Sequence, residues 1–85
     1  MYLIYGRILD SKGIAIPNAK LIDVPSWATS DDYGIFQAEI FSDTTILRFE
    51  TERQICTVML PPYTENEGIV AIGDLLCDLQ AKVEQ

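Results

Sequence analysis

The chain has 85 residues, and its 13 acidic against 6 basic side chains give a net charge of −7 at pH 7. Such a surface repels phosphate backbones and anionic lipids, which argues against nucleic-acid and membrane-surface binding. No stretch approaches the roughly 20 apolar residues that cross a membrane, so we expect no direct membrane insertion. The length predicts one domain with a thin core over residues 1–85, and we expect it to be a fragment of a larger protein.

Residue types that commonly carry catalysis or bind metals are scarce. Histidine is absent, which removes the commonest general base and metal ligand. Cys56 and Cys77 do not form a CxxC pair, so a zinc or thioredoxin-like site has little support. The two cysteines either remain buried thiols or form a disulfide, which we favour because closing a loop of roughly 20 residues adds about 3 kcal/mol. We predict no catalytic residue, metal or cofactor.

In chain order, short apolar or alternating segments are separated by turn residues. Residues 2–9 are rich in aromatic and β-branched side chains and end at the turn sequence DSKG, residues 10–13. The further predicted strands are residues 14–16, 19–24, 35–41, 44–50, 55–60 and 69–72. Residues 74–83 fit a helix or a strand about equally, with the strand favoured as far as Cys77.

The short spacing of these segments predicts an all-β fold, a small antiparallel β-sandwich of about seven strands, Ig-like or transthyretin-like. Successive side chains of a strand face opposite sides. The core predicted from this alternation is Ile8, Leu21, Phe36, Leu47, Phe49, Val58 and Leu60. In residues 55–60 the second face is nearly as apolar, which indicates either a central strand beneath a long loop or a contact with another chain.

The stretch TSDDYGIF, residues 29–36, places two acids before a glycine between predicted strands. Asp31 and Asp32 can bond their own backbone and glycine accepts a left-handed φ, so a turn explains the stretch better than a calcium site, which needs six to eight oxygen ligands. Trp27, the only tryptophan, either caps the sandwich edge or anchors a partner. We name Trp27, Asp31 and Asp32 as candidate partner contacts, because one corner combines an aromatic anchor with charge.

Two spaced patterns occupy the first half of the chain. They are Gly6-x-Ile8-x-Asp10-x-x-Gly13-x-x-Ile16-Pro17-x-Ala19-x-Leu21 and Thr29-x-Asp31-x-x-Gly34-x-Phe36. Together they resemble the carboxypeptidase-regulatory-like, transthyretin-related β-sandwich family. In that family the two turns join the first strands of the sandwich. The chain departs from the family in residues 24–28, VPSWA, where a typical repeat carries a second glycine.

The second half carries a cysteine within RQICTVML, residues 53–60, and the pattern Val70-x-x-Gly73-Asp74-x-x-Cys77. These features are similar to the C-terminal periplasmic domain of outer-membrane ushers, above all those of the alternate, colonisation-factor type of chaperone-usher pilus pathway. The resemblance implies a non-catalytic module of the Gram-negative periplasm that binds chaperone–pilin subunit complexes. A bridge between Cys56 and Cys77 is expected in that oxidising compartment.

Two other functions compete with this interpretation. The chain is alternatively a structural or adhesive β-sandwich repeat of a cell-surface protein, in which case tandem copies are expected. It is otherwise an accessory domain of an enzyme, which a preceding catalytic domain would indicate.

Overall fold

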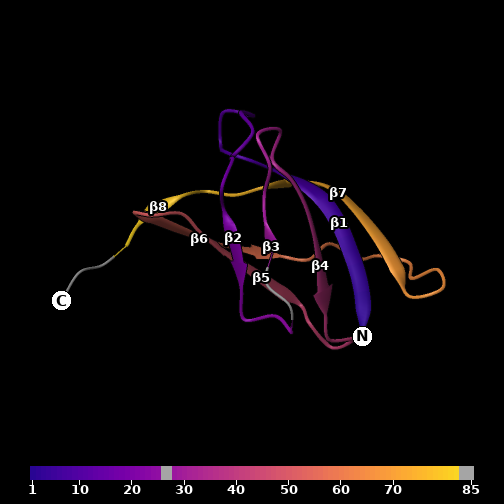
Figure 1. Cartoon of the computed structure of the whole chain (residues 1–85). Coiled ribbons are helices and arrows are strands. Elements are labelled where there is room, and N and C mark those ends of the chain that lie inside the picture. The colour runs from indigo at the N-terminus through magenta and orange to yellow at the C-terminus, as the bar shows by residue number, and fades with distance from the viewer. Residues whose placement is uncertain (26–27, 83–85) are drawn as a thin grey trace.

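The structure, a computed structural model, describes residues 1–25 and 28–82, which form two β-sheets packed face to face. The smaller sheet, ordered β4-β1-β7, contains β1 (Tyr2–Leu9), β4 (Ile35–Ile40) and β7 (Ile69–Leu76). The larger sheet, ordered β3-β2-β5-β6-β8, contains β2 (Lys20–Ile22), β3 (Ala28–Thr29), β5 (Ile46–Glu50), β6 (Gln54–Met59) and β8 (Gln80–Ala81). In Figure 1, β1 and β7 lie toward the right of the view and β6 and β8 toward the left. The predicted all-β sandwich is confirmed.

One ladder differs from the predicted antiparallel arrangement, because β1 and β7 run parallel. β1 pairs with β4 in the antiparallel sense, as do the neighbouring strands of the larger sheet. The chain reaches β7 from β6 in the opposite sheet, and a parallel pair requires such a crossover. Alternation along one strand does not reveal its direction, since the side-chain period is two residues in either case.

Strand number and bounds also differ from the prediction. Residues 14–16 do not form a strand, since only a single bridge joins Ala15 to Leu9. The helical alternative for residues 74–83 is wrong as far as residue 82: β7 continues through Leu76, and β8 pairs with β6. The described residues contain eight strands instead of about seven, and two of them are only two residues long.

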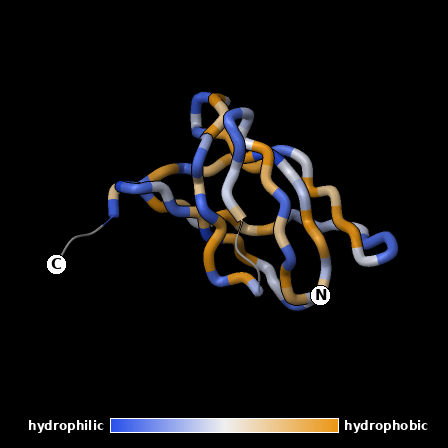
Figure 2. The backbone as a smooth tube through the Cα atoms, viewed as in Figure 1, coloured by the Kyte–Doolittle hydropathy of each residue, from blue (hydrophilic) through white to orange (hydrophobic). Residues whose placement is uncertain are grey.

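The core lies between the two sheets and is built mainly from alternate residues of β1, β2, β4, β5, β6 and β7, while β3 and β8 contribute no fully buried side chain. Hydrophobic and hydrophilic positions accordingly alternate along parts of the chain in Figure 2. Six of the seven predicted core residues are buried, and the exception, Leu60, is only partly buried. Leu60 follows the end of β6 and precedes Pro61 and Pro62, which cannot donate hydrogen bonds to a ladder. The buried hydrophobic residues are Ile4, Ile8, Ile16, Ala19, Leu21, Phe36, Ala38, Ile40, Leu47, Phe49, Cys56, Val58, Val70, Ile72, Leu75 and Cys77.

A disulfide joins the two sheets. Cys56 lies in β6 of the larger sheet, Cys77 directly follows β7 of the smaller sheet, and their Cα atoms are 5.7 Å apart. Both side chains are buried. The backbone N–H of Cys77 also donates to the carbonyl of Leu9 at 2.7 Å, which attaches this end of β7 to β1.

Candidate functional site

Two of the predicted contact residues, Asp31 and Asp32, lie in the turn between β3 and β4. The Asp31 carboxylate oxygen Oδ1 accepts hydrogen bonds from the backbone N–H groups of Tyr33 and Ile35, each at 2.9 Å. Asp31 therefore closes the turn, as expected for an aspartate before a glycine. Asp32 is exposed, and no described residue bonds to its carboxylate. Trp27, the third predicted contact, lies outside the described residues.

The turn after β1 is built in the same way. Oδ1 of Asp10 accepts from the N–H groups of Lys12 and Ile14 at 2.8 and 2.9 Å, and the N–H of Gly13 donates to the Asp10 carbonyl at 2.9 Å. The two turns lie side by side at the top of Figure 1. Since the same Asp-x-x-Gly geometry occurs twice, local turn formation explains both aspartates.

Replacing Asp31 should destabilise the fold, whereas replacing Asp32 should not. Asp31→Ala removes two hydrogen bonds to the backbone, so we expect the free energy of unfolding to fall by about 1 to 2 kcal/mol. Asp32→Ala should change it by less than about 0.5 kcal/mol, as is usual for exposed positions. Urea unfolding of the two variants measures the difference. Equal stabilities would contradict the structural role of Asp31.

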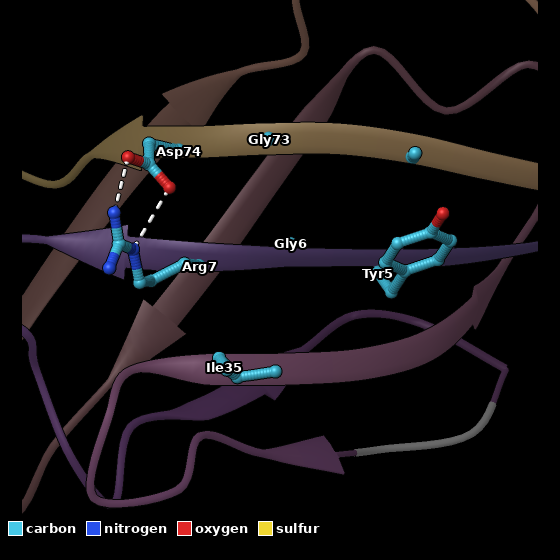
Figure 3. A pocket seen from close by; sticks show the side chains of 7 residues that line it. Tyr5, Gly6, Arg7, Ile35, Gly73 and Asp74 are labelled. Carbon is cyan, nitrogen blue, oxygen red and sulfur yellow. Dashed lines mark hydrogen bonds and ion pairs between the residues drawn. The ribbon is translucent and has the colours of Figure 1, made fainter.

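The structure also shows a surface that the sequence analysis did not identify, on the outer side of the smaller sheet. A shallow hollow of about 350 Å³ lies there across all three strands. Figure 3 shows the residues that line it. Its lining is Tyr5, Gly6 and Arg7 from β1, Ile35 from β4, and Ala71, Gly73 and Asp74 from β7. We call the outward side of β4, β1 and β7 the outer face.

The hollow results from small residues in an irregular part of the β1–β7 ladder. The register shifts between Tyr5 and Gly6, so that Tyr5 pairs with Ala71 and Gly6 with Gly73. A Cβ on Gly6 would lie 2.7 Å from the Gly73 carbonyl oxygen, so this approach requires glycine. A Cβ on Gly73 would meet no atom within 4 Å. Ala71 and Gly73 therefore leave the floor of the hollow open between the bulkier side chains around it.

An ion pair forms one end of the hollow. The Arg7 guanidinium donates two hydrogen bonds to the Asp74 carboxylate, at 2.9 and 2.7 Å, and both side chains are about half exposed. These hydrogen bonds are the main reason that the pKa of Asp74 lies below its ordinary value of 3.8, and the pKa of Arg7 is raised by the same contact. The two hydrogen bonds fix the guanidinium plane beside the apolar floor.

Asp74 should titrate below pH 3.8, and its pKa should rise toward that value in the Arg7→Gln variant. The folded pKa is depressed, so the pair contributes stability above the unfolded pKa and loses it as pH falls through the folded pKa. Carboxyl ¹³C shifts followed by NMR from pH 6 to pH 2 measure both values. An unchanged Asp74 midpoint in Arg7→Gln would contradict the assignment.

Two further features concern metals and membranes. In residues 1–25 and 28–82, no three aspartate, glutamate or cysteine side chains are arranged to hold a metal ion. The same part of the chain contains no helix that is long and apolar enough to span a membrane.

Comparison with known proteins identifies the family. The family model described as "CS1-pili formation C-terminal" matches residues 1–78, which include every strand except β8. No curated protein and no solved structure matches the chain. The family match confirms the resemblance to usher C-terminal domains and supports a role in pilus formation in the Gram-negative cell envelope. The chain therefore belongs to the CS1-pili formation C-terminal family, the C-terminal domain of the usher in the CS1 pilus system.

Proposed function

We propose that this domain binds chaperone–pilin subunit complexes on the periplasmic side of an usher during pilus assembly, without catalysing a reaction. The observation that carries the proposal is the family match over residues 1–78. A disulfide between Cys56 and Cys77 agrees with a periplasmic location, since such bonds persist in oxidising compartments.

The charge of the domain supports a protein partner with a basic surface. At a net charge of −7, long-range attraction would speed the encounter with such a partner. The effect should weaken as ionic strength rises above about 0.15 M, where the screening length is roughly 8 Å.

Calorimetry with the chaperone–subunit complex of the same pilus system tests the proposal. We expect saturable binding by calorimetry and, in surface-binding kinetics, an association rate that falls between about 0.05 M and 0.3 M salt. Free chaperone, carrying no subunit, is the control for recognition of the loaded complex. No detectable binding at tens of micromolar would refute the proposed function.

The corner residues Trp27, Asp31 and Asp32 remain our proposed contacts. Asp31 requires a variant that keeps the turn, because its Oδ1 accepts two backbone hydrogen bonds. Asp31→Asn retains an acceptor oxygen and removes the charge. Weaker binding by Asp31→Asn, Asp32→Asn and Trp27→Ala would support the corner, whereas wild-type affinity in all three would exclude it.

Deletion of the domain from the usher tests whether binding matters for assembly. We expect fewer pili on cells that carry the truncated usher at wild-type levels in the outer membrane. Unchanged piliation would show that assembly does not need binding by this domain and that the domain acts only as a spacer.

A further inference from the structure

Apolar side chains are concentrated on the outer face, although it is turned away from the core. The large hydrophobic residues on this face include Tyr5, Ile35, Ile69 and Leu76, which are 47%, 50%, 47% and 67% exposed. They come from three adjacent strands, since β1 pairs with both β4 and β7. Exposed apolar residues that gather on one sheet face, instead of lying singly, indicate an interaction site.

The hollow around Arg7 and Asp74 continues along the sheet into a second hollow. That hollow has about 470 Å³ and shares Tyr5 and Ala71 with the first. Its far side is formed by the loop between β6 and β7, which includes Glu67, and by Ile69 at the start of β7. The two hollows therefore meet at Tyr5 and Ala71, which pair across β1 and β7, and together they form one recessed band.

The Arg7–Asp74 pair lies within this apolar surface in a form that a partner can cover. Both of its hydrogen bonds are already made in the isolated domain. When a partner covers this pair, the two charges remain bonded to each other. The costly case, a buried ion without a partner, is therefore avoided. Arginine and tyrosine are also the residue types enriched at the energetic centre of protein interfaces.

The charge of the outer face selects the kind of partner. The three strands contribute one base, Arg7, and two acids, Glu39 and Asp74. Since Arg7 and Asp74 neutralise each other, Glu39 on β4 and Glu67 in the loop before β7 leave the margin of the face negative. A complementary surface would have an apolar centre bordered by lysine or arginine.

The outer side of the larger sheet has a different charge pattern. Arg48 and Lys82, from β5 and the residue after β8, pair with Asp23 and Glu50 at 2.9 and 3.4 Å. This side therefore carries bases and acids together, and a partner with a basic border gains less from it.

We propose that the domain holds its protein partner on the outer face of the β4-β1-β7 sheet together with the neighbouring Asp31 turn, which is joined to this face by hydrogen bonds between Asp31 and Ile35. The partner places apolar side chains in the two hollows and basic residues opposite Glu39 and Glu67. The inference rests on the proposed function, because it locates the binding of the chaperone–subunit complex.

The test compares two double variants of the 85-residue chain with matched exposure. Ile35→Ser/Leu76→Ser removes side chains that are 50% and 67% exposed on the outer face, and Ile46→Ser/Met59→Ser removes side chains that are 50% and 76% exposed on the larger sheet. We expect the first variant to bind the chaperone–subunit complex at least tenfold more weakly and the second to bind within twofold of the wild type. Melting temperatures and ¹H–¹⁵N spectra verify that both variants are folded.

A charge variant tests the second part of the proposal. Glu39→Lys should slow association severalfold at low salt and reduce its salt dependence, because it reverses a charge at the margin of the outer face. Glu52 is exposed between β5 and β6 of the larger sheet, so Glu52→Lys is a matched reversal with the same change in net charge away from the outer face, and it should slow association less.

The outcomes separate the inference from the proposed function. If the wild-type domain binds and Ile35→Ser/Leu76→Ser binds equally well, the outer face is excluded and the proposed function stands. Loss of affinity only in Ile46→Ser/Met59→Ser assigns binding to the larger sheet and also overturns the inference. A wild-type domain that does not bind the complex overturns both.

Discussion

Reduction of the disulfide between Cys56 and Cys77 is expected to lower the free energy of unfolding by about 2 to 5 kcal/mol, the usual cost of removing a native bridge from a small secreted domain. The bond closes a loop with a sequence separation of 21 residues, so it restricts the unfolded chain. It also joins β6 of the larger sheet to the end of β7 in the smaller one. Its loss therefore removes a covalent connection between the sheets of a thin sandwich.

Thermal unfolding followed by circular dichroism, with and without a phosphine reductant, measures this effect. For a domain of this size, a loss of 1 kcal/mol lowers the melting temperature by roughly 4 to 8 °C. The Cys56→Ala/Cys77→Ala variant is the control, because its melting temperature should be low and insensitive to the reductant. Equal melting temperatures for oxidised and reduced wild-type protein would refute the prediction.

The second large effect is expected from Gly34→Ala, which should reduce the free energy of unfolding by about 3 kcal/mol. Gly34 has a φ of +78°, where an L-residue is strained. An added Cβ would also lie 2.5 Å from the carbonyl oxygen of Ile8. The Gly34 carbonyl accepts a hydrogen bond from the Ile8 N–H at 2.8 Å, so relieving the clash would disturb the contact between the turn and β1.

Gly13→Ala is a matched control for Gly34→Ala. Gly13 occupies the same position of the other Asp-x-x-Gly turn with a φ of +80°, but a Cβ there would meet no atom within 4 Å. Gly13→Ala should therefore lower the free energy of unfolding only by the cost of the backbone conformation, about 1 to 2 kcal/mol. Urea unfolding of the two variants isolates the steric part as their difference. Equal losses of unfolding free energy in the two variants would show that the Ile8 carbonyl does not hinder a Cβ at residue 34.

The two turns illustrate which parts of the fold are predictable from sequence. The Asp10 and Asp31 turns form through hydrogen bonds to residues two and four positions later, so all their determinants lie within a few residues. Alternation in β4 is equally local, and it correctly places Phe36 in the core. It is less informative at strand ends, where Leu60 is only partly buried.

Of the two candidate sites, the sequence indicated one and missed the other. The sequence indicated a corner with Asp31 and Asp32, and the structure shows that the Asp31 carboxylate bonds to its own turn. The outer face was missed although Tyr5 and Arg7 alternate with the buried Ile4 and Ile8 in β1. That alternation was a usable signal for exposure, but it did not reveal which strands stand beside β1.

By itself, the sequence determined the all-β class, the two turns and most of the core, because these depend on side-chain alternation and backbone bonding over a few residues. Only the tertiary structure decided that β7 runs parallel to β1 and that Arg7 meets Asp74 across 67 residues. It also decided that apolar side chains of three strands share one exposed face. The physical reason is that strands of either direction have the same two-residue period, so the choice of neighbouring strand depends on how the whole chain packs its two sheets.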